Sequence, residues 1–431
     1  MTSHRIRTLL FAVVGTASLV GVSAPATAVA PAPAVSTHAS VSYHHWSTAG
    51  QFAAGSFAGT VAVNGSVTFG HAVGRTSYDD GGFGYPTRTF DYATWTSPRF
   101  APGFGLTELV SSWNAATPAG TWLQVQMRGH TTSGSLSGWY TMGRWASGDG
   151  TIHRTSVPGQ SDANGAVYID TFFAAKGRSL RDYQLKVTLL RLPGTRAVPV
   201  LRSVGAVASA LPADKKVPVS PLGGAEGVTL AVPRYSQDVH KGEYPKFDGG
   251  GEAWCSPTST EMVVEYYGRR PGARQLAWVN PRYADPSVDY AARYTFDYNY
   301  SGTGNWPFNT AYAGSYGLQA FVTQLRSLTE AEQFIKAGIP LTVSVSFKAS
   351  ELDGAGYSTN GHLMDIVGFA ANGDVVVNDP VSPNDRGVRK TYDRTQFENV
   401  WIPTSRSGGV AYVVHDGAHP LPRNVAGVPN W

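Results

Sequence analysis

The chain has 431 residues, more than one ordinary domain holds, so two domains of typical size are expected. Its apolar fraction of 42% is enough to build real cores and excludes wholesale disorder. The formal charge is only +4, and no lysine or arginine cluster lies beyond the N-terminal segment, which excludes nucleic-acid binding. With 49 glycines, 27 prolines and few charged residues, the composition favours many short strands and turns.

The N-terminal residues follow the pattern of an export signal. Two arginines precede an apolar run over residues 9–22, and small residues then offer a cleavage site after Ala28 or Ala30. We predict a signal peptide over residues 1–28 and a disordered leader over residues 29–41. An uncleaved anchor is the alternative. The expected protein is secreted, extracellular or associated with the cell wall, and does not contact a membrane once the signal is removed.

Residues 42–209 have the pattern of β structure. Apolar and polar residues alternate over residues 183–189 and again over residues 123–127, the period of a strand with one exposed face. Glycine-rich turns separate such runs, and no long amphipathic helix is apparent. An all-β sandwich is therefore predicted for this half.

Aromatic residues in this half allow two interpretations. They are Trp113, Trp122, Trp139, Tyr140 and Trp145. They would either stack on cell-wall glycans or fill the core, and the core is the better account of any single one. Asp79 and Asp80 are adjacent acids in a turn, which falls far short of a calcium ligand set. Neither a metal nor a cofactor is predicted.

Residues 210–227 are rich in proline and glycine without apolar periodicity, which predicts a linker and a domain boundary. The signals over residues 228–415 are mixed and predict an α+β domain, followed by a C-terminal tail over residues 416–431. A helix is expected over residues 259–267. A capping box of Thr329 and Glu332 predicts a second helix, and the strands are expected over residues 341–347, 362–369 and 374–378.

Cys255 is the only cysteine, so it cannot form an intramolecular disulfide. A lone cysteine is most often a buried apolar residue. Cys255, however, follows three glycines and stands directly before the predicted helix, with Pro257 suited to the first helical turn. The positive end of a helix favours a thiolate, so this is a position for a nucleophile.

A thiolate nucleophile needs a general base. Three histidines follow Cys255, and His415 and His419 belong to a polar segment that solvent would cover. His362 opens an apolar strand and is the preferred base. The base needs an orienting group, for which Asp365 and Asp379 are the candidates.

The choice between these two acids depends on strand register. Asp365 points to the face opposite His362, because side chains alternate along a strand. With a strict two-residue turn, Asp379 lies opposite Ile366 and about 13 Å from His362, while Asn378 faces away. Contact between Asp379 and His362 therefore requires a shifted register or a bulge, for example at Gly368 or Ala370.

Acyl transfer also needs hydrogen-bond donors that stabilise the negative charge developing on the carbonyl oxygen. The backbone N–H of Cys255 is one, and the side-chain amide of Gln237, eighteen residues earlier, is a candidate for the second. An isolated glutamine is usually a surface residue.

Four ordered segments resemble family 39 of the cysteine peptidases, papain-like enzymes best known as bacteriocin leader processing domains, with many secreted bacterial relatives. The segments are Val232-Pro233-Arg234-Tyr235-Ser236-Gln237, Trp254-Cys255-Ser256-Pro257-Thr258-Ser259, Gly361-His362-Leu363-Met364-Asp365-Ile366-Val367-Gly368-Phe369 and Val377-Asn378-Asp379-Pro380. The resemblance covers residues 228–415. It implies a papain-like fold in which Gln237 forms the oxyanion hole, Cys255 is the nucleophile, His362 the base and Asp379 its orienting group. Ser256 departs from the glycine that is common there, and Asp365 interrupts a stretch that is usually apolar.

The expectation is a secreted cysteine peptidase with a peptide or protein substrate. Cell-wall glycan is a candidate partner of the N-terminal β-sandwich. One alternative keeps the triad but acts as a cell-wall amidase or acyl transferase. Another is a surface- or glycan-binding protein with an inactive peptidase-like half.

Overall fold

The computed structural model describes residues 40–425 and 429–431. The predicted signal peptide and residues 29–39 of the leader lie outside the described residues. Residues 40 and 41, which the sequence assigned to the leader, belong to strand β1 (Ser40–Trp46), so that boundary was wrong by two residues. They are ordered because β1 pairs along its whole length with the strand that ends at Ala210. Among the described residues, no helix combines the length and hydropathy needed to cross a bilayer.

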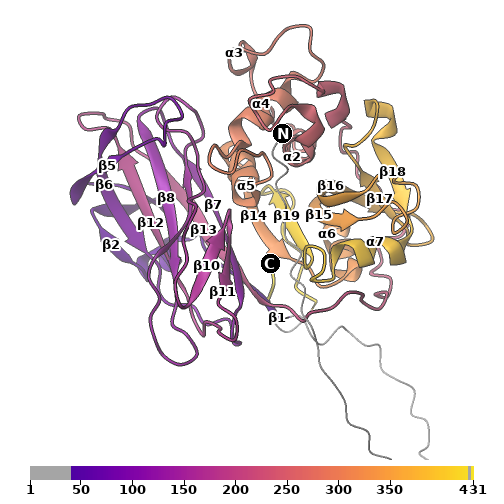
Figure 1. Ribbon diagram of the computed structural model, residues 1–431, viewed down its shortest axis with the longest axis horizontal. Helices are drawn as coiled ribbons and strands as arrows, with labels where there is room; N and C mark the ends of the chain where they lie inside the picture. The colour runs from indigo at the N-terminus through magenta and orange to yellow at the C-terminus, as the bar shows by residue number, and fades with distance from the viewer. Residues whose placement is uncertain (1–39, 426–428) are drawn as a thin grey trace, which may run out of the picture.

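The N-terminal module is β-rich. Its remaining strands are β2 (Ser56–Ala58), β3 (Thr60–Val63), β4 (Ser66–Phe69), β5 (Gly74–Tyr78), β6 (Arg88–Thr96), β7 (Glu108–Ala116), β8 (Thr121–Arg128), β9 (Tyr140–Trp145), β10 (Gly165–Tyr168), β11 (Thr171–Ala174), β12 (Gln184–Arg191) and β13 (Val200–Ala210). One sheet has the order β10-β11-β7-β13-β4-β3 with β1 beside β13, and the other β2-β6-β12-β8-β9 with β5 beside β6. The two sheets pack against each other (Figure 1), and apart from the short helix α1 (Ala49–Ala53) no α-helix is found over residues 40–209.

The core between these sheets follows the alternation in the sequence. Leu185, Val187 and Leu189 of β12 are fully buried, while the residues between them are partly exposed. Four of the five aromatic residues considered as glycan platforms, Trp113, Trp122, Tyr140 and Trp145, are buried. They fill cores, and the platform interpretation is wrong for them. Trp139 is half-buried, and the cationic groups of Arg128 and Lys186 each lie 4.4 Å from the centroid of its ring.

The second module contains a sheet of order β14-β19-β15-β16-β17-β18, with all its strand pairs antiparallel. The strands are β14 (Gln319–Gln324), β15 (Leu341–Phe347), β16 (Thr359–Phe369), β17 (Val375–Asn378), β18 (Arg389–Tyr392) and β19 (Val410–His415). The helices are α2 (Cys255–Tyr266), α3 (Ala273–Leu276), α4 (Pro286–Thr295), α5 (Trp306–Ser315), α6 (Leu328–Lys336) and α7 (Arg394–Trp401), with the 3-10 turns η1 (Gln237–His240), η2 (Gly251–Ala253) and η3 (Asp385–Gly387). Helices α2, α4 and α5 gather on one side of this sheet, and α6 and α7 lie on the other (Figure 1).

Two helix starts differ from the sequence prediction. Helix α2 begins at Cys255, four residues before the predicted start, with Pro257 in its first turn. The predicted capping box of Thr329 and Glu332 is wrong, because α6 begins after Ser327, whose hydroxyl accepts from the Glu330 N–H. The Glu332 carboxylate instead accepts hydrogen bonds from backbone N–H groups in the predicted linker, just before residue 228. This tertiary contact, and not a helix cap, explains where the Glu332 side chain lies.

The two modules share a buried interface. Phe308 and Ala311 of α5 belong to the same apolar core as Trp113 of β7, and the Phe308 and Trp113 rings meet edge to face at 6.2 Å. Asn114 of β7 bonds both backbone groups of Ala320 in edge strand β14, at 2.8 and 3.1 Å. The edge of one sheet is thus satisfied by side chains of the other module, as a buried strand edge requires.

The predicted linker and tail are both bonded to the rest of the molecule. Residues 211–227 form no helix or strand, yet the Ser220 N–H donates to Glu398 at 2.8 Å. In the C-terminal tail, Asn430 is fully buried and donates to the Gln324 carbonyl at 2.9 Å. These bonds fix both segments to the second module.

Candidate active site

Cys255 occupies the first residue of α2, and its side chain is partly exposed. The 3-10 turn η2 ends at Ala253, two residues before the cysteine, and the Trp254 ring between them is fully buried. A helix N-terminus presents free N–H groups and positive potential to a group placed there. The fold therefore leaves the thiol accessible in a setting that stabilises negative charge.

His362 lies between Cys255 and Asp379. Its Nε2 lies 2.9 Å from Asp379 Oδ1, which leaves Nδ1 as the ring nitrogen available to the Cys255 thiol. Burial of the ring by itself lowers the pKa of His362, but the hydrogen bonds with Asp379 and Cys255 and the charges of both groups outweigh it. The pKa rises to about 9. The imidazole is thus held as a cation beside the buried Asp379 carboxylate at neutral pH.

A bulge in β16 makes this contact with Asp379 possible. Asp365 pairs with Asn378 and Ile366 with Val377, whereas Gly368 pairs with Val376, so β16 carries one extra residue between Ile366 and Gly368. The turn is also wider than two residues, because the last pair before it joins Phe369 to Val375. Both irregularities move Asp379 toward His362, as the sequence argument required. Asn378 faces away and donates to the Pro233 carbonyl at 2.8 Å.

Gln237 begins η1 and is buried. Its backbone N–H donates to the Pro380 carbonyl at 3.0 Å, and its side-chain Nε2 donates to the Glu252 carbonyl at 2.9 Å. Glu252 is three residues before the cysteine and Pro380 directly follows Asp379, so the structure brings all four residues singled out in the sequence together. An amide carries two N–H donors, and within the described chain only one of them is used.

Gly251 permits this approach of η1. A Cβ atom on residue 251 would lie 2.3 Å from the Gln237 carbonyl oxygen and 2.7 Å from the His240 Cβ. Here the glycine run before the cysteine makes room for the chain's own η1 segment.

Two protein-family models match this chain. Residues 42–209 match the model described as Peptidase C39 N-terminal domain, and residues 229–408 match the model described as Peptidase_C39 like family. Residues 229–408 therefore form a domain of the C39-like peptidase family, and residues 42–209 the N-terminal domain that accompanies it.

Two solved structures have low sequence identity to this chain. A C39-like peptidase from Bacillus anthracis is 18% identical, with a TM-score of 0.28, over 44% of this chain and 97% of that one. The enzymatically active domain of tailspike protein 4 of bacteriophage CBA120 is 10% identical, with a TM-score of 0.16, over 38% of this chain and 20% of that one. The comparison with curated proteins found no match.

Both departures from the family motif are buried in the C39-like domain. The Ser256 hydroxyl lies 3.0 Å from the Tyr412 hydroxyl and is not exposed, so it does not line the approach to the thiol. Asp365 accepts a hydrogen bond of 2.6 Å from Thr342, which lies opposite it on the neighbouring strand β15. Burial raises the pKa of Asp365 well above its usual range. It takes no part in the His362 contacts.

His415 also differs from expectation. It ends β19 and is buried, with Nδ1 close to the carbonyl oxygens of Asp416 and His419, so it is not solvated surface.

Three residues that the sequence analysis did not single out surround the Asp379 carboxylate. It accepts from the hydroxyl of Tyr357 at 3.1 Å, from that of Tyr392 at 2.8 Å and from Lys390 Nζ at 2.9 Å. Although burial works against it, the hydrogen bond and charge of His362, followed by Lys390, hold the Asp379 pKa below its usual range. The only sequence signal was that Lys390 and Tyr392 are two apart on a short strand and share a face.

The loop over residues 296–305, which joins α4 to α5, contacts the N-terminal module. Asp297 accepts from the Ser156 N–H of the N-terminal module at 2.9 Å, and Asn299 donates to the Ser156 carbonyl at 2.8 Å. Tyr300 is close enough to Cys255 for their charges to interact, so the loop also borders the thiol.

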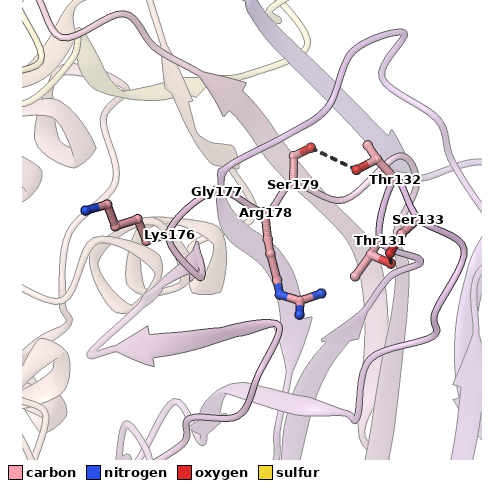
Figure 2. Close-up of a pocket in the computed structure, with 7 residues that line it drawn as sticks. All are labelled: Thr131, Thr132, Ser133, Lys176, Gly177, Arg178 and Ser179. Atoms are coloured by element: carbon pink, nitrogen blue, oxygen red, sulfur yellow. Dashed lines mark hydrogen bonds between the residues drawn. The ribbon is translucent and has the colours of Figure 1, made fainter.

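A pocket of about 360 Å³ lies in the N-terminal module, apart from these residues (Figure 2). Loops after β8 and β11 form it, and its lining residues are Thr131, Thr132, Ser133, Lys176, Gly177, Arg178 and Ser179. The exposed side chains of Lys176 and Arg178 extend in different directions, so they do not converge on one ligand. Asp79 and Asp80 form internal bonds to the Gly81 N–H and to His153.

Proposed function

We propose that this chain is a cysteine peptidase of papain-like fold that hydrolyses peptide bonds through Cys255, His362 and Asp379. The observation that carries the proposal is the position of His362, hydrogen-bonded on one side to a partly exposed thiol at a helix N-terminus and on the other to a buried carboxylate. This is the arrangement of a nucleophile, a general acid–base and an orienting group.

The steps follow from these positions. The Cys255 sulfur attacks the peptide carbonyl carbon, and the oxygen becomes negative while the Cys255 N–H and the Gln237 amide donate to it. His362 gives its proton to the leaving amine as the C–N bond breaks, which leaves a thioester on Cys255. The neutral imidazole then takes a proton from water, whose oxygen attacks the thioester and releases the acid.

The experiment that tests this proposal compares the wild type with Cys255→Ala on a peptide library read by mass spectrometry. We expect the substitution to reduce cleavage by about 10⁴-fold or more while the far-UV and near-UV spectra stay unchanged. Ser256→Ala is the matched control, because Ser256 is adjacent but its side chain is buried away from the thiol. Cleavage retained by Cys255→Ala would refute the mechanism.

Labelling with a cysteine-directed covalent inhibitor separates this function from that of an inactive binding protein. We expect the folded wild type to be labelled at Cys255, and labelling to slow strongly in His362→Ala. A folded protein that resists labelling would favour the binding protein instead.

The proposal includes export. Residues 1–28 carry the predicted signal, and the mature chain is expected to begin directly after Ala28 or Ala30. N-terminal sequencing of the protein recovered from the culture medium tests this, and a chain found only inside the cell would contradict it.

A further inference from the structure

A second cluster of titratable side chains lies beside the candidate active site. His240 ends η1, Glu243 follows it in the next turn, and Asp289 lies in the first turn of α4. His240 Nδ1 is 2.8 Å from Glu243 Oε2 and 3.5 Å from Asp289 Oδ2. One atom from each residue lies within 4.8 Å of the others, a spacing that one cation with bonds of about 2.0–2.6 Å can bridge.

The cluster contains buried polar atoms that the described protein leaves unsatisfied. Asp289 is fully buried, and neither of its carboxylate oxygens has a hydrogen-bond partner among the described residues. The same holds for His240 Nε2, whose ring is also fully buried. A buried carboxylate without donors is costly, and such groups are normally paired or bound to a metal. Among the described residues, the only ion-pair partner of the Glu243 and Asp289 carboxylates is His240, when it is protonated.

We propose that His240, Glu243 and Asp289 bind a divalent cation of the Zn²⁺ or Mn²⁺ class. The ring nitrogen selects these ions over Mg²⁺ or Ca²⁺, which prefer oxygen ligands alone, and the two carboxylates balance the charge. Glu243 is 9% exposed, so the cluster reaches the surface at this residue. Water would complete the coordination on that side.

The cation would join parts of the chain that carry the candidate active site. His240 is in the same 3-10 turn as Gln237, and its ring lies 5.9 Å from that of Trp254, which directly precedes Cys255. Asp289 belongs to α4, which packs on α2. A bound ion would therefore fix η1 against α4 and hold the Gln237 segment in place. This role is structural, and the inference does not depend on peptidase activity.

Zn²⁺ binding by the full chain carrying Cys255→Ala tests the proposal, because this background removes the thiol, which could itself bind zinc. After chelator treatment and dialysis, we expect one Zn²⁺ per chain by titration calorimetry and elemental analysis. At a hundred times the dissociation constant, the melting temperature should rise on the order of 5 °C. Co²⁺ should give a visible absorption band that reports on the His240 nitrogen.

Asp289→Asn and His240→Gln, each in the Cys255→Ala background, should weaken Zn²⁺ binding by at least about tenfold and remove the melting shift. The control is Asp365→Asn, which alters another fully buried carboxyl outside the cluster and should bind Zn²⁺ as before. Affinity that is equal in Asp289→Asn and in the parent would overturn the proposal, as would no binding of Zn²⁺ or Mn²⁺ by the folded parent. Since every protein in this experiment lacks the thiol, its result is independent of whether the wild type cleaves peptides.

Discussion

The Nε2 atom of His362 lies 2.9 Å from the Oδ1 atom of Asp379, although these residues are seventeen positions apart in the chain. The contact exists because β16 carries a bulge between Ile366 and Gly368 and because Asp379 directly follows β17. It connects a buried anion to an imidazole that also bonds Cys255. The acid–base behaviour of the site follows from this pair.

Replacing Asp379 by Asn should lower kcat by about 10²- to 10⁴-fold with little change in fold. The amide keeps the volume of the carboxylate but loses its charge, so the pKa of His362 should fall from about 9. NMR titration of the His362 ring in both proteins measures this directly. The expectation fails if the pKa of the ring is the same in the variant.

The pH dependence of kcat/KM should have a descending limb near pH 9. The folded pKa of His362 is raised to about 9 from an ordinary value near 6.5, so the imidazolium is fully present below pH 6.5. Its stabilising contribution and its ability to protonate the leaving amine are both lost as the pH rises through 9. A rate profile measured between pH 5 and 10.5 tests this, and a rate still constant at pH 10.5 would contradict it.

Tyr392→Phe should destabilise the protein by about 1.5–3 kcal/mol, because it removes a hydrogen bond of 2.8 Å to the buried Asp379 carboxylate. Tyr183→Phe is the matched control, since that buried hydroxyl has a longer bond, 3.4 Å, to a neutral carbonyl. Chemical denaturation of both variants gives the comparison. Equal losses of unfolding free energy in the two variants would show that the charge of the acceptor does not strengthen the hydrogen bond.

Gln237→Ala should reduce kcat by about 10²- to 10³-fold with a small effect on KM, as expected for a donor used mainly in the transition state. Asp238→Asn, on the same η1 turn, is the control and should retain the rate. Steady-state kinetics on one fluorogenic peptide measures both. A change confined to KM would instead assign Gln237 to ground-state binding.

Phe308→Ala should destabilise the protein by about 3–5 kcal/mol, because a fully buried aromatic ring is removed from the core shared by both modules. Phe57→Ala, at a 37% exposed ring of β2, should cost far less. Calorimetric unfolding measures both. A loss below about 1 kcal/mol for Phe308→Ala would mean that the two modules are stable independently of this contact.

Local sequence chemistry determined much of this protein. Alternating residues fixed which side chains of β8 and β12 face the core, and strand β15 has the bounds that its apolar run predicts. Cys255, with glycines before it and Pro257 after it, marked a helix start, because these residues act on the backbone within one turn. The chemistry that a thiol nucleophile needs made His362, Asp379 and Gln237 candidates, and the family resemblance chose Asp379 over Asp365.

Tertiary structure decided the rest. The bulge that brings Asp379 to His362 depends on pairing between strands, and the three donors around Asp379 come from separate segments. The contact of His240 with Asp289 joins residues 49 positions apart, and that of Asn114 with Ala320 of β14 joins residues 206 apart. Such contacts arise from packing between distant segments, whereas propensity and periodicity report only on neighbours along the chain.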